Sequence, residues 1–235
     1  NGCMPGLAGG AYTDRNIFYS SYLSTYIERD VRELSGTIDA LKFSRFITAV
    51  AARAAQMVNY QAIADDAEVD KATAKKWLEI LETLGIIFLL HPFSNNVLKR
   101  TIKSPKLYFY DTGFVCYLTR WSSPEVAESG AMSGALLENF AVSEIMKSYQ
   151  NVGETPYMHY YRDRDAREID VILEGDGKLC PLEIKKTTTP DKRITRAFKL
   201  IDKSPLELGT SAVLCMTDKL SAFDSKNLIV PIWLI

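Results

Sequence analysis

The stretch Glu168-Ile-Asp170-Val-Ile-Leu-Glu-Gly-Asp-Gly-Lys-Leu-Cys-Pro-Leu-Glu183-Ile-Lys185 indicates the fold more clearly than any other part of the chain. Two runs rich in apolar residues flank Gly-Asp-Gly, a pattern that predicts two β-strands joined by a tight turn. Side chains two positions apart on a strand share a face. We therefore expect Glu183 and Lys185 to point the same way, with Asp170 of the neighbouring strand within reach of both.

Two carboxylates and an ammonium on an apolar sheet suggest a site for a divalent cation. Two carboxylates about 4 Å apart repel each other by a few kcal/mol at an effective dielectric near 20, and Mg²⁺ or Mn²⁺ would offset that repulsion. Such an ion can hold a phosphate oxygen and lower the pKa of a bound water, while Lys185 would orient the water or neutralise developing charge. The alternative is a surface hairpin with a solvated Glu–Lys pair worth less than about 1 kcal/mol.

A third acid lies upstream, in a segment whose apolar spacing predicts a helix over residues 133–149. Glu138 shares a side of this helix with Ala141, Val142 and Ile145, so we expect it to be partly buried. An ionised carboxylate in such a position needs a partner or a metal. Glu144 is the competing candidate, and an ordinary glutamate at the edge of an apolar stripe is the alternative for Glu138.

A basic segment follows the Glu-x-Lys strand and is expected to be a helix over residues 190–204. A positive face beside a metal site suits a phosphate backbone, although a solvated charged face explains the same pattern. The candidate DNA-binding residues of this helix are Lys192, Arg193 and Arg196.

The order of these elements resembles the PD-(D/E)XK (restriction-endonuclease-like) nuclease core, an αβββαβ arrangement with a central mixed sheet. The predicted helix with Glu138 is followed by strands at 157–162, 168–173 and 179–186, by the basic helix, and by strands at 211–217 and 228–234. The resemblance implies a catalytic set of Glu138, Asp170, Glu183 and Lys185, with Asp170, Glu183 and the carbonyl of Ile184 as metal ligands. The proline that gives the superfamily its name is replaced by Ile169.

The preceding region resembles a winged helix, a helix-turn-helix variant. Helices are predicted at 41–55, 60–67 and 70–84, the last with Asp70 as its N-cap and Gly85 as its stop, followed by strands at 86–90 and 106–110. The third helix and the hairpin, with Lys106 also in its loop, would then contact DNA. The candidate residues are Lys71, Thr73, Lys75, Lys76, Lys99, Arg100 and Lys103. The acidic run around Asp65, Asp66 and Glu68 leaves protein docking open as the alternative role.

Taken together, the two modules resemble the C-terminal half of prokaryotic AAA-type ATP-binding proteins that end in a domain of unknown function. This resemblance implies residues 1–35 as the tail of an ATPase module with a connecting helix, 36–120 as the winged helix and 121–235 as the nuclease-like domain. It also implies an upstream ATPase module as a partner, possible homo-oligomers and DNA as the nucleic acid. The printed sequence has no Gly-x-x-x-x-Gly-Lys-Ser/Thr loop. We therefore expect this chain to be a fragment of a longer protein, with ATP bound only in the upstream module.

The composition of the chain limits where DNA could bind and disfavours some kinds of metal site. A net charge of −1 over 235 residues restricts any DNA contact to local basic clusters. The 4 cysteines lack C-x-x-C spacing and only 2 histidines are present, which disfavours a zinc site. A cytoplasmic protein is expected, because no secretory signal or membrane-length apolar run is found. Two hypotheses follow: a metal-dependent phosphodiesterase, or a non-catalytic module that uses the nuclease fold as a scaffold to bind DNA or protein.

Overall fold

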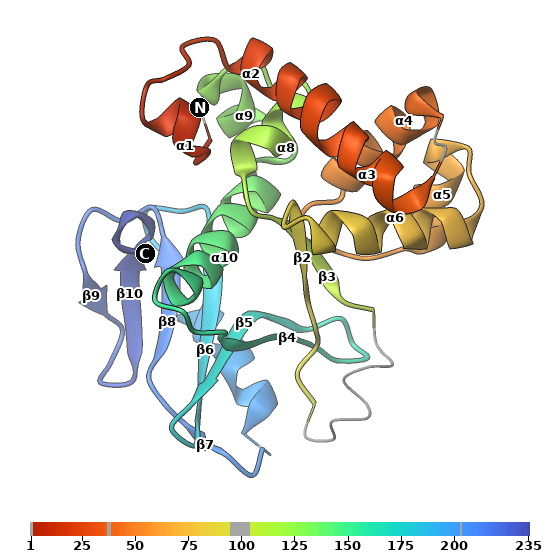
Figure 1. Cartoon of the computed structure of the whole chain (residues 1–235). Helices are drawn as coiled ribbons and strands as arrows, with labels where there is room; N and C mark the ends of the chain where they lie inside the picture. Colours follow the sequence, from red (N-terminus) through yellow and green to blue (C-terminus); the bar gives the residue numbers. More distant parts are fainter. Residues whose placement is uncertain (1, 37–38, 95–103, 203) are drawn as a thin grey trace. The chain divides into compact units, whose positions relative to one another are not determined.

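The computed structural model describes residues 2–36, 39–94, 104–202 and 204–235. It confirms a mixed α/β protein with a mixed, multi-stranded sheet. The chain forms two compact units, the first made of Asn1–Leu89 and Leu107–Leu136 and the second of Leu90–Lys106 and Leu137–Ile235. Figure 1 shows the elements of both units in sequence colours.

The first unit begins with a short helix and a long helical rod. Helix α1 (Pro5–Ala8) is followed by α2 (Arg15–Ser21), a π-helical stretch η1 (Tyr22–Ile27) and α3 (Glu28–Ser35), which continue one another without a break (Figure 1). The Asp14 side chain caps α2 by accepting hydrogen bonds from two backbone amides. Tyr19, Ile27 and Val31 are fully buried, so this rod belongs to the core of the first unit.

Three further helices follow, each with a side chain as its N-cap. They are α4 (Ala40–Ala51), α5 (Tyr60–Ala67) and α6 (Lys71–Thr83), capped by Asp39, Asn59 and Asp70. The prediction of a helix over 41–55 was too long at its C-terminal end, because α4 stops at Ala51 and Ala55 takes a left-handed conformation with φ of 61°. The predicted cap Asp70 and the left-handed Gly85 after α6 are both present.

A small sheet and two more helices complete the first unit. Strands β1 (Gln56–Met57), β2 (Ile87–Leu90) and β3 (Lys106–Phe109) lie in the order β1-β3-β2, and β1 was not predicted. Helices α8 (Thr112–Leu118) and α9 (Pro124–Ser129) follow. Phe43, Phe46 and Trp77 form a cluster of edge-to-face and tilted rings in the core.

The second unit is built around a seven-stranded sheet with the order β4-β5-β6-β8-β10-β9, while β7 pairs with β6. Strands β4, β5 and β6 run antiparallel to their neighbours in this series, whereas β6, β8 and β10 are parallel. Helix α10 (Ser133–Asn151) precedes the sheet. The strands are β4 (Tyr157–Arg162), β5 (Glu168–Gly175), β6 (Lys178–Lys185), β7 (Glu207–Leu208), β8 (Ser211–Cys215), β9 (Ser221–Ala222) and β10 (Asn227–Pro231).

The basic segment after β6 is a 3₁₀ helix, η2 (Lys192–Ile201), rather than the longer regular helix predicted over 190–204. Its two buried residues, Phe198 and Ile201, are three positions apart, which matches the three residues per turn of a 3₁₀ helix. They pack with Ile172, Leu179 and other apolar residues of the sheet. A final 3₁₀ turn, η3 (Ile232–Leu234), ends the chain.

None of the helices in the described ranges combines the length and the apolar character needed to cross a membrane.

Candidate active site

The paired strands β5 and β6 bring Asp170 and Glu183 to one place. Val171 pairs with Leu182 in the antiparallel ladder, so Asp170 and Glu183 are the next residues on the two strands. The backbone N–H of Ile184 donates a 2.8 Å hydrogen bond to Oδ2 of Asp170. A side-chain carboxylate therefore accepts from the backbone of the neighbouring strand at the point where the regular pairing ends, and this bond fixes the Asp170 side chain.

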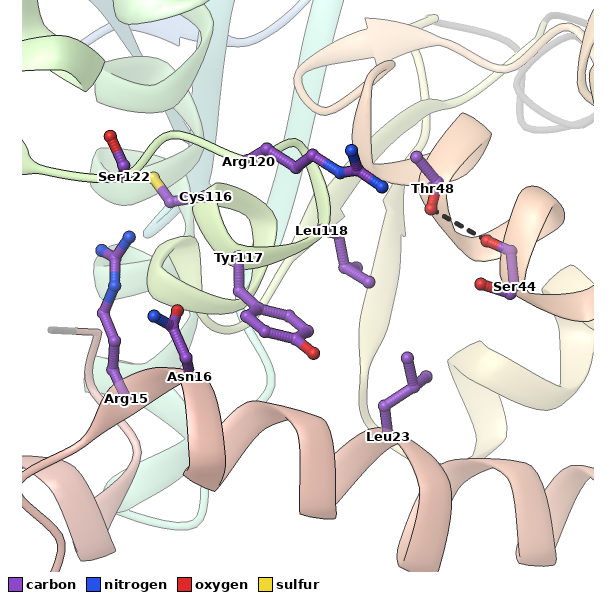
Figure 2. Close-up of a pocket in the computed structure, with 10 residues that line it drawn as sticks. All are labelled: Arg15, Asn16, Leu23, Ser44, Thr48, Cys116, Tyr117, Leu118, Arg120 and Ser122. Carbon is purple, nitrogen blue, oxygen red and sulfur yellow. Dashed lines mark hydrogen bonds between the residues drawn. The ribbon is translucent and has the colours of Figure 1, made fainter.

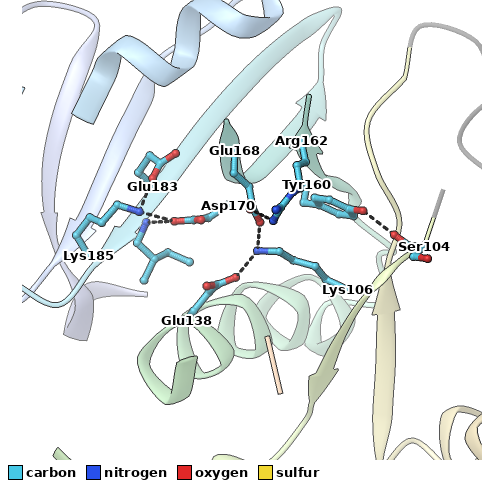
Figure 3. Close-up of polar contacts among 10 residues, drawn as sticks. Ser104, Lys106, Glu138, Tyr160, Arg162, Glu168, Asp170, Glu183 and Lys185 are labelled. Carbon is cyan, nitrogen blue, oxygen red and sulfur yellow. Dashed lines mark hydrogen bonds and ion pairs between the residues drawn. The ribbon is translucent and has the colours of Figure 1, made fainter. Parts of the chain in front are cut away.

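Lys185 joins the two acids. Its Nζ lies 3.2 Å from Oδ2 of Asp170 and 2.6 Å from Oε2 of Glu183 (Figure 3). Asp170 and Glu183 are 7% and 4% exposed, while the Lys185 side chain is 40% exposed. The predicted convergence of these three side chains is thus found, with the ammonium between buried carboxylates and solvent.

Burial and neighbouring charges shift the pKa values of Glu183 and Lys185. Desolvation, reinforced by the nearby Asp170 carboxylate, raises the pKa of Glu183 to about 8 although Lys185 acts in the opposite direction. Burial acts to lower the pKa of Lys185, but the charges of Asp170 and Glu183 outweigh it and raise this pKa to about 12. Oε1 of Glu183 is buried without a hydrogen-bond partner among the described residues. Glu183 therefore holds a proton near neutral pH.

Glu138 contacts a residue that the sequence interpretation had placed elsewhere. Its Oε1 accepts a 2.8 Å hydrogen bond from Nζ of Lys106, and the same Nζ lies 2.5 Å from Oε1 of Glu168. Arg162 makes a further ion pair with Glu168 at 2.9 Å. Lys106, expected among exposed lysines of the wing, is instead only 4% exposed. Burial disfavours the charge of Lys106, but Glu138 and Glu168 outweigh that effect and raise its pKa.

The surroundings of Lys106 hold its side chain in place. Nζ of Lys106 lies 5.7 Å from the centre of the Tyr160 ring, a distance at which a cation is attracted to the ring face. The hydroxyl of Tyr160 donates a 2.6 Å hydrogen bond to the carbonyl of Ser104. Lys106 and Glu168 are the functional candidates that sequence reasoning missed. A lysine at the start of the apolar run Lys-Leu-Tyr-Phe was the available signal for the first of them.

Two charge clusters therefore share one region of the second unit (Figure 3). Glu168 and Asp170 are two residues apart on β5 and lie on the same face of that strand. The described part of the chain contains no group of three or more His, Cys, Asp or Glu side chains arranged to hold a metal. The structure thus brings Asp170, Glu183 and Lys185 together and places Glu138 with Lys106.

The basic residues of η2 border a cleft of about 570 Å³ within the second unit. Lys192 pairs with Asp224 at 2.9 Å and Arg193 with Asp191 at 2.7 Å. Arg196 is exposed and makes no ion pair with the described residues. Two of the three predicted DNA contacts on this helix are thus engaged by neighbouring acids.

On α6, the lysines predicted to contact DNA lie on the surface. Lys71, Lys75 and Lys76 are exposed, and Lys75 lies 3.7 Å from Glu79 one turn along the helix. The hydroxyl of Thr73 donates to the capping carboxylate of Asp70 at 2.6 Å, so Thr73 serves the helix start. The other predicted contacts, Lys99, Arg100 and Lys103, lie outside the described residues.

Comparison with protein families assigns most of the first unit to a known family. A family model described as "Domain of unknown function (DUF8612)" matches residues 1–125, more than half of the sequence. The chain belongs to this family. A second model, "Domain of unknown function (DUF4143)", matches residues 133–235, which include Asp170, Glu183 and Lys185.

Two mycobacterial proteins are similar along most of the chain. Uncharacterized protein Mb2031c of Mycobacterium bovis and uncharacterized protein Rv2008c of Mycobacterium tuberculosis are each 27% identical over 213 residues. The alignments cover 91% of this chain and 47% of each relative, so the chain spans about half the length of the curated relatives it matches. The search of solved structures found no significant match.

Proposed function

We propose that the second unit carries a divalent-cation-dependent phosphodiesterase site formed by Asp170, Glu183 and Lys185. The observation that carries this proposal is the convergence of two buried carboxylates on one ammonium, with Oε1 of Glu183 left without a partner in the described residues. A buried acid without a full set of partners is costly, and clustered carboxylates with perturbed pKa values are typical of functional sites.

The donor set suits Mg²⁺ or Mn²⁺. Asp170 and Glu183 would hold the cation through carboxylate oxygens, and the resemblance to PD-(D/E)XK nucleases adds the carbonyl of Ile184. A cation bound there supplies positive charge to a phosphate group and lowers the pKa of a water. Oε1 of Glu183, which has no hydrogen-bond partner among the described residues, supports the fit, because hard cations prefer oxygen ligands.

The residues themselves have separable roles. Glu183 carries a proton near neutral pH and would release it when it becomes a ligand. Lys185, 40% exposed and held by both acids, would present its ammonium to a phosphate oxygen that reaches the site from solvent. Asp170, fixed by the Ile184 amide, would anchor the cation.

The roles proposed for the first unit and for the chain as a whole rest on the resemblance to AAA-type ATP-binding proteins. We propose that the first unit is a winged helix that contacts DNA through α6, and that the chain is the effector portion of a protein with an upstream AAA-type ATP-binding module. Exposed Lys71, Lys75 and Lys76 support the DNA contact. The relatives are about twice as long as the matched segment, which leaves room for a further module in them.

The second candidate function is a non-catalytic binding module that keeps the nuclease-like fold as a scaffold. One observation favours it: Glu138, expected to assist the metal, is paired with buried Lys106. In the described residues the three acids do not form a metal-holding group.

A plasmid-nicking assay with Mn²⁺ separates the two functions. We expect the wild-type chain to nick DNA, and Asp170→Asn and Lys185→Ala to lose at least about a hundredfold of the rate. Lys178→Ala is a matched control, since Lys178 lies exposed at the turn of the same hairpin. Equal rates for all four chains would reject the catalytic assignment.

Gel shifts over a range of salt concentrations test the first unit. Replacing Lys75 and Lys76 by alanine, together with Lys99 and Arg100, is expected to weaken binding and reduce its salt dependence. Unchanged binding would reassign α6 to protein docking.

A further inference from the structure

The first unit contains a cavity of about 410 Å³ beside α8, called the α8 cavity here, that is unrelated to the acidic site. Its walls come from α2, η1, α4, α8 and the segment that follows α8 (Figure 2). This volume lies within the range of about 300–1,000 Å³ that is usual for small-molecule sites.

The lining of the α8 cavity is positively charged. It includes Arg15 and Arg120 and contains no aspartate or glutamate. Neither arginine makes an ion pair with the described residues, although the guanidinium of Arg15 donates a 2.6 Å hydrogen bond to the carbonyl of Trp121. Two guanidinium groups without an acid between them favour an anionic ligand, and the guanidinium fork suits phosphate oxygens.

The two arginines lie at different ends of the α8 cavity. In Figure 2 the Arg120 side chain extends toward Thr48, Arg15 lies near Asn16, and the Tyr117 ring lies between the two arginines. Arg120 has a φ of 62°, the left-handed conformation that commonly ends a helix, and the amides of Arg120 and Trp121 bond the carbonyls of Tyr117 and Cys116 at the end of α8.

We infer that the α8 cavity binds a phosphate-bearing small molecule, with its phosphate on Arg120 and its organic part beside Tyr117. Arg120 is assigned to the phosphate because the guanidinium of Arg15 is already oriented by Trp121. Leu23 and Leu118 supply apolar wall for the organic part. The site lies entirely within the first unit, so it is independent of the proposed phosphodiesterase.

Protection of Cys116 from a thiol reagent tests this inference. Cys116 lines the cavity and is partly exposed, so a bound ligand should slow its modification. The reporter is the full chain with Cys3→Ser and Cys180→Ser, which leaves Cys116 and the buried Cys215. The probes are AMP, inorganic phosphate, adenosine and succinate at millimolar concentration. We expect AMP to slow labelling at least about threefold, and adenosine and succinate to have no effect.

Two variants and one control sharpen the result. Arg120→Met keeps a side chain at the same left-handed position but removes the charge, and it should abolish protection by AMP. Thr48→Val should weaken the protection of Cys116 by AMP. Thr48 is exposed on α4, so this change should leave the fold intact. Arg32→Met, an exposed arginine of α3, should retain full protection.

Protection by inorganic phosphate as strong as by AMP would support the phosphate site and assign it to the free anion. The inference is overturned if adenosine or succinate protects as well as AMP, if no probe protects, or if the Arg120 and Thr48 variants keep full protection.

Discussion

Oε2 of Glu183 lies 2.6 Å from Nζ of Lys185, two residues further along the same strand. An ion pair between positions i and i+2 of a strand keeps both groups on one face, and here the acid is buried while the amine reaches solvent. Because Asp170 is also within reach of the ammonium, one positive charge serves two carboxylates. The proton on Glu183 balances the remaining charge.

The first prediction concerns pH and stability. The ordinary pKa of glutamate, 4.5, rises to about 8 at Glu183, so between these values the folded state binds more protons than the unfolded state. Wild-type stability should therefore fall as pH rises from about 4.5 to 8. Glu183→Gln lacks this loss. We expect it to match the wild type at pH 5 and to exceed it by roughly 2–4 kcal/mol at pH 8.5 in urea unfolding.

Glu154→Gln is the control for this measurement, because Glu154 is exposed in the same unit. It should track the wild type at both pH values. A Glu183→Gln curve that runs parallel to the wild type across this range would show that Glu183 ionises normally.

The second prediction links the cation to that proton. At pH 7 the binding of Mn²⁺ should release close to one proton, because Glu183 must ionise to become a ligand. Calorimetric titrations in buffers of different ionisation enthalpy measure this number directly. Asp170→Asn should abolish binding, and wild-type affinity should rise about tenfold per pH unit below pH 8. Binding without proton release would place the cation away from Glu183.

Local sequence patterns were sufficient to predict the strands and helices that carry this site. Contacts between residues far apart in the sequence could not be predicted from such patterns. The alternation around Asp170 and Glu183 predicted both strands and their shared face, and Asp70 and Gly85 marked the ends of α6. These features depend on residues a few positions apart. Lys106 escaped detection because its partners are 32 and more residues away, and the apolar run that follows it does not indicate which acids it meets. The two-residue strand β1 was missed because both its residues are exposed.

The third prediction concerns buried Lys106. Lys106→Met removes the charge that Glu138 and Glu168 share, and leaving partly buried carboxylates without their counter-ion should cost about 3–5 kcal/mol of unfolding free energy. Adding Glu138→Gln and Glu168→Gln should recover much of the loss, since the repulsion then disappears.

Lys147→Met is the matched control, because Lys147 pairs with Glu144 on the same helix as Glu138 but is 24% exposed. It should cost less than about 1 kcal/mol. Equal losses for the two methionine variants in thermal unfolding would mean that the Lys106 cluster is no stronger than a surface pair.

The fourth prediction concerns Asp111, whose two oxygens each accept two hydrogen bonds. Oδ2 accepts from the amides of Cys3 and Met4, and Oδ1 accepts from the Tyr19 hydroxyl and the Phe114 amide. In Asp111→Asn the new NH₂ group must face either the two amides of Cys3 and Met4 or the amide of Phe114, so at least one backbone N–H loses its acceptor. We expect a loss of about 3 kcal/mol, measured by urea unfolding.

Asp39→Asn provides the comparison for Asp111. Asp39 caps α4 as Asp111 caps α8, but Asp39 accepts both of its bonds through one oxygen. Asparagine is an equally good N-cap, so the change should stay within a few tenths of a kcal/mol. Similar losses at both positions would show that the Asp111 contacts with Cys3, Met4 and Tyr19 contribute little.

The last prediction concerns the close approach of Gly2 and Gly113. A Cβ atom at Gly113 would meet the Tyr19 hydroxyl and lie 2.5 Å from Cα and 2.7 Å from N of Gly2. Gly113→Ala should therefore force residues 2–4 away from α8 and cost about 1–3 kcal/mol. A protease of broad specificity should then cut the N-terminal segment faster; trypsin is unsuitable, because residues 1–14 contain no Lys or Arg. Gly134→Ala is the control, because a Cβ there meets nothing within 4 Å and lies in α10. That change should stabilise the chain by roughly 0.5–1 kcal/mol.

A double variant separates the two parts of this clash. Because one part is with the Tyr19 hydroxyl, Tyr19→Phe combined with Gly113→Ala should cost less than the two single changes added together. Additive losses would instead place the clash on the Gly2 backbone alone.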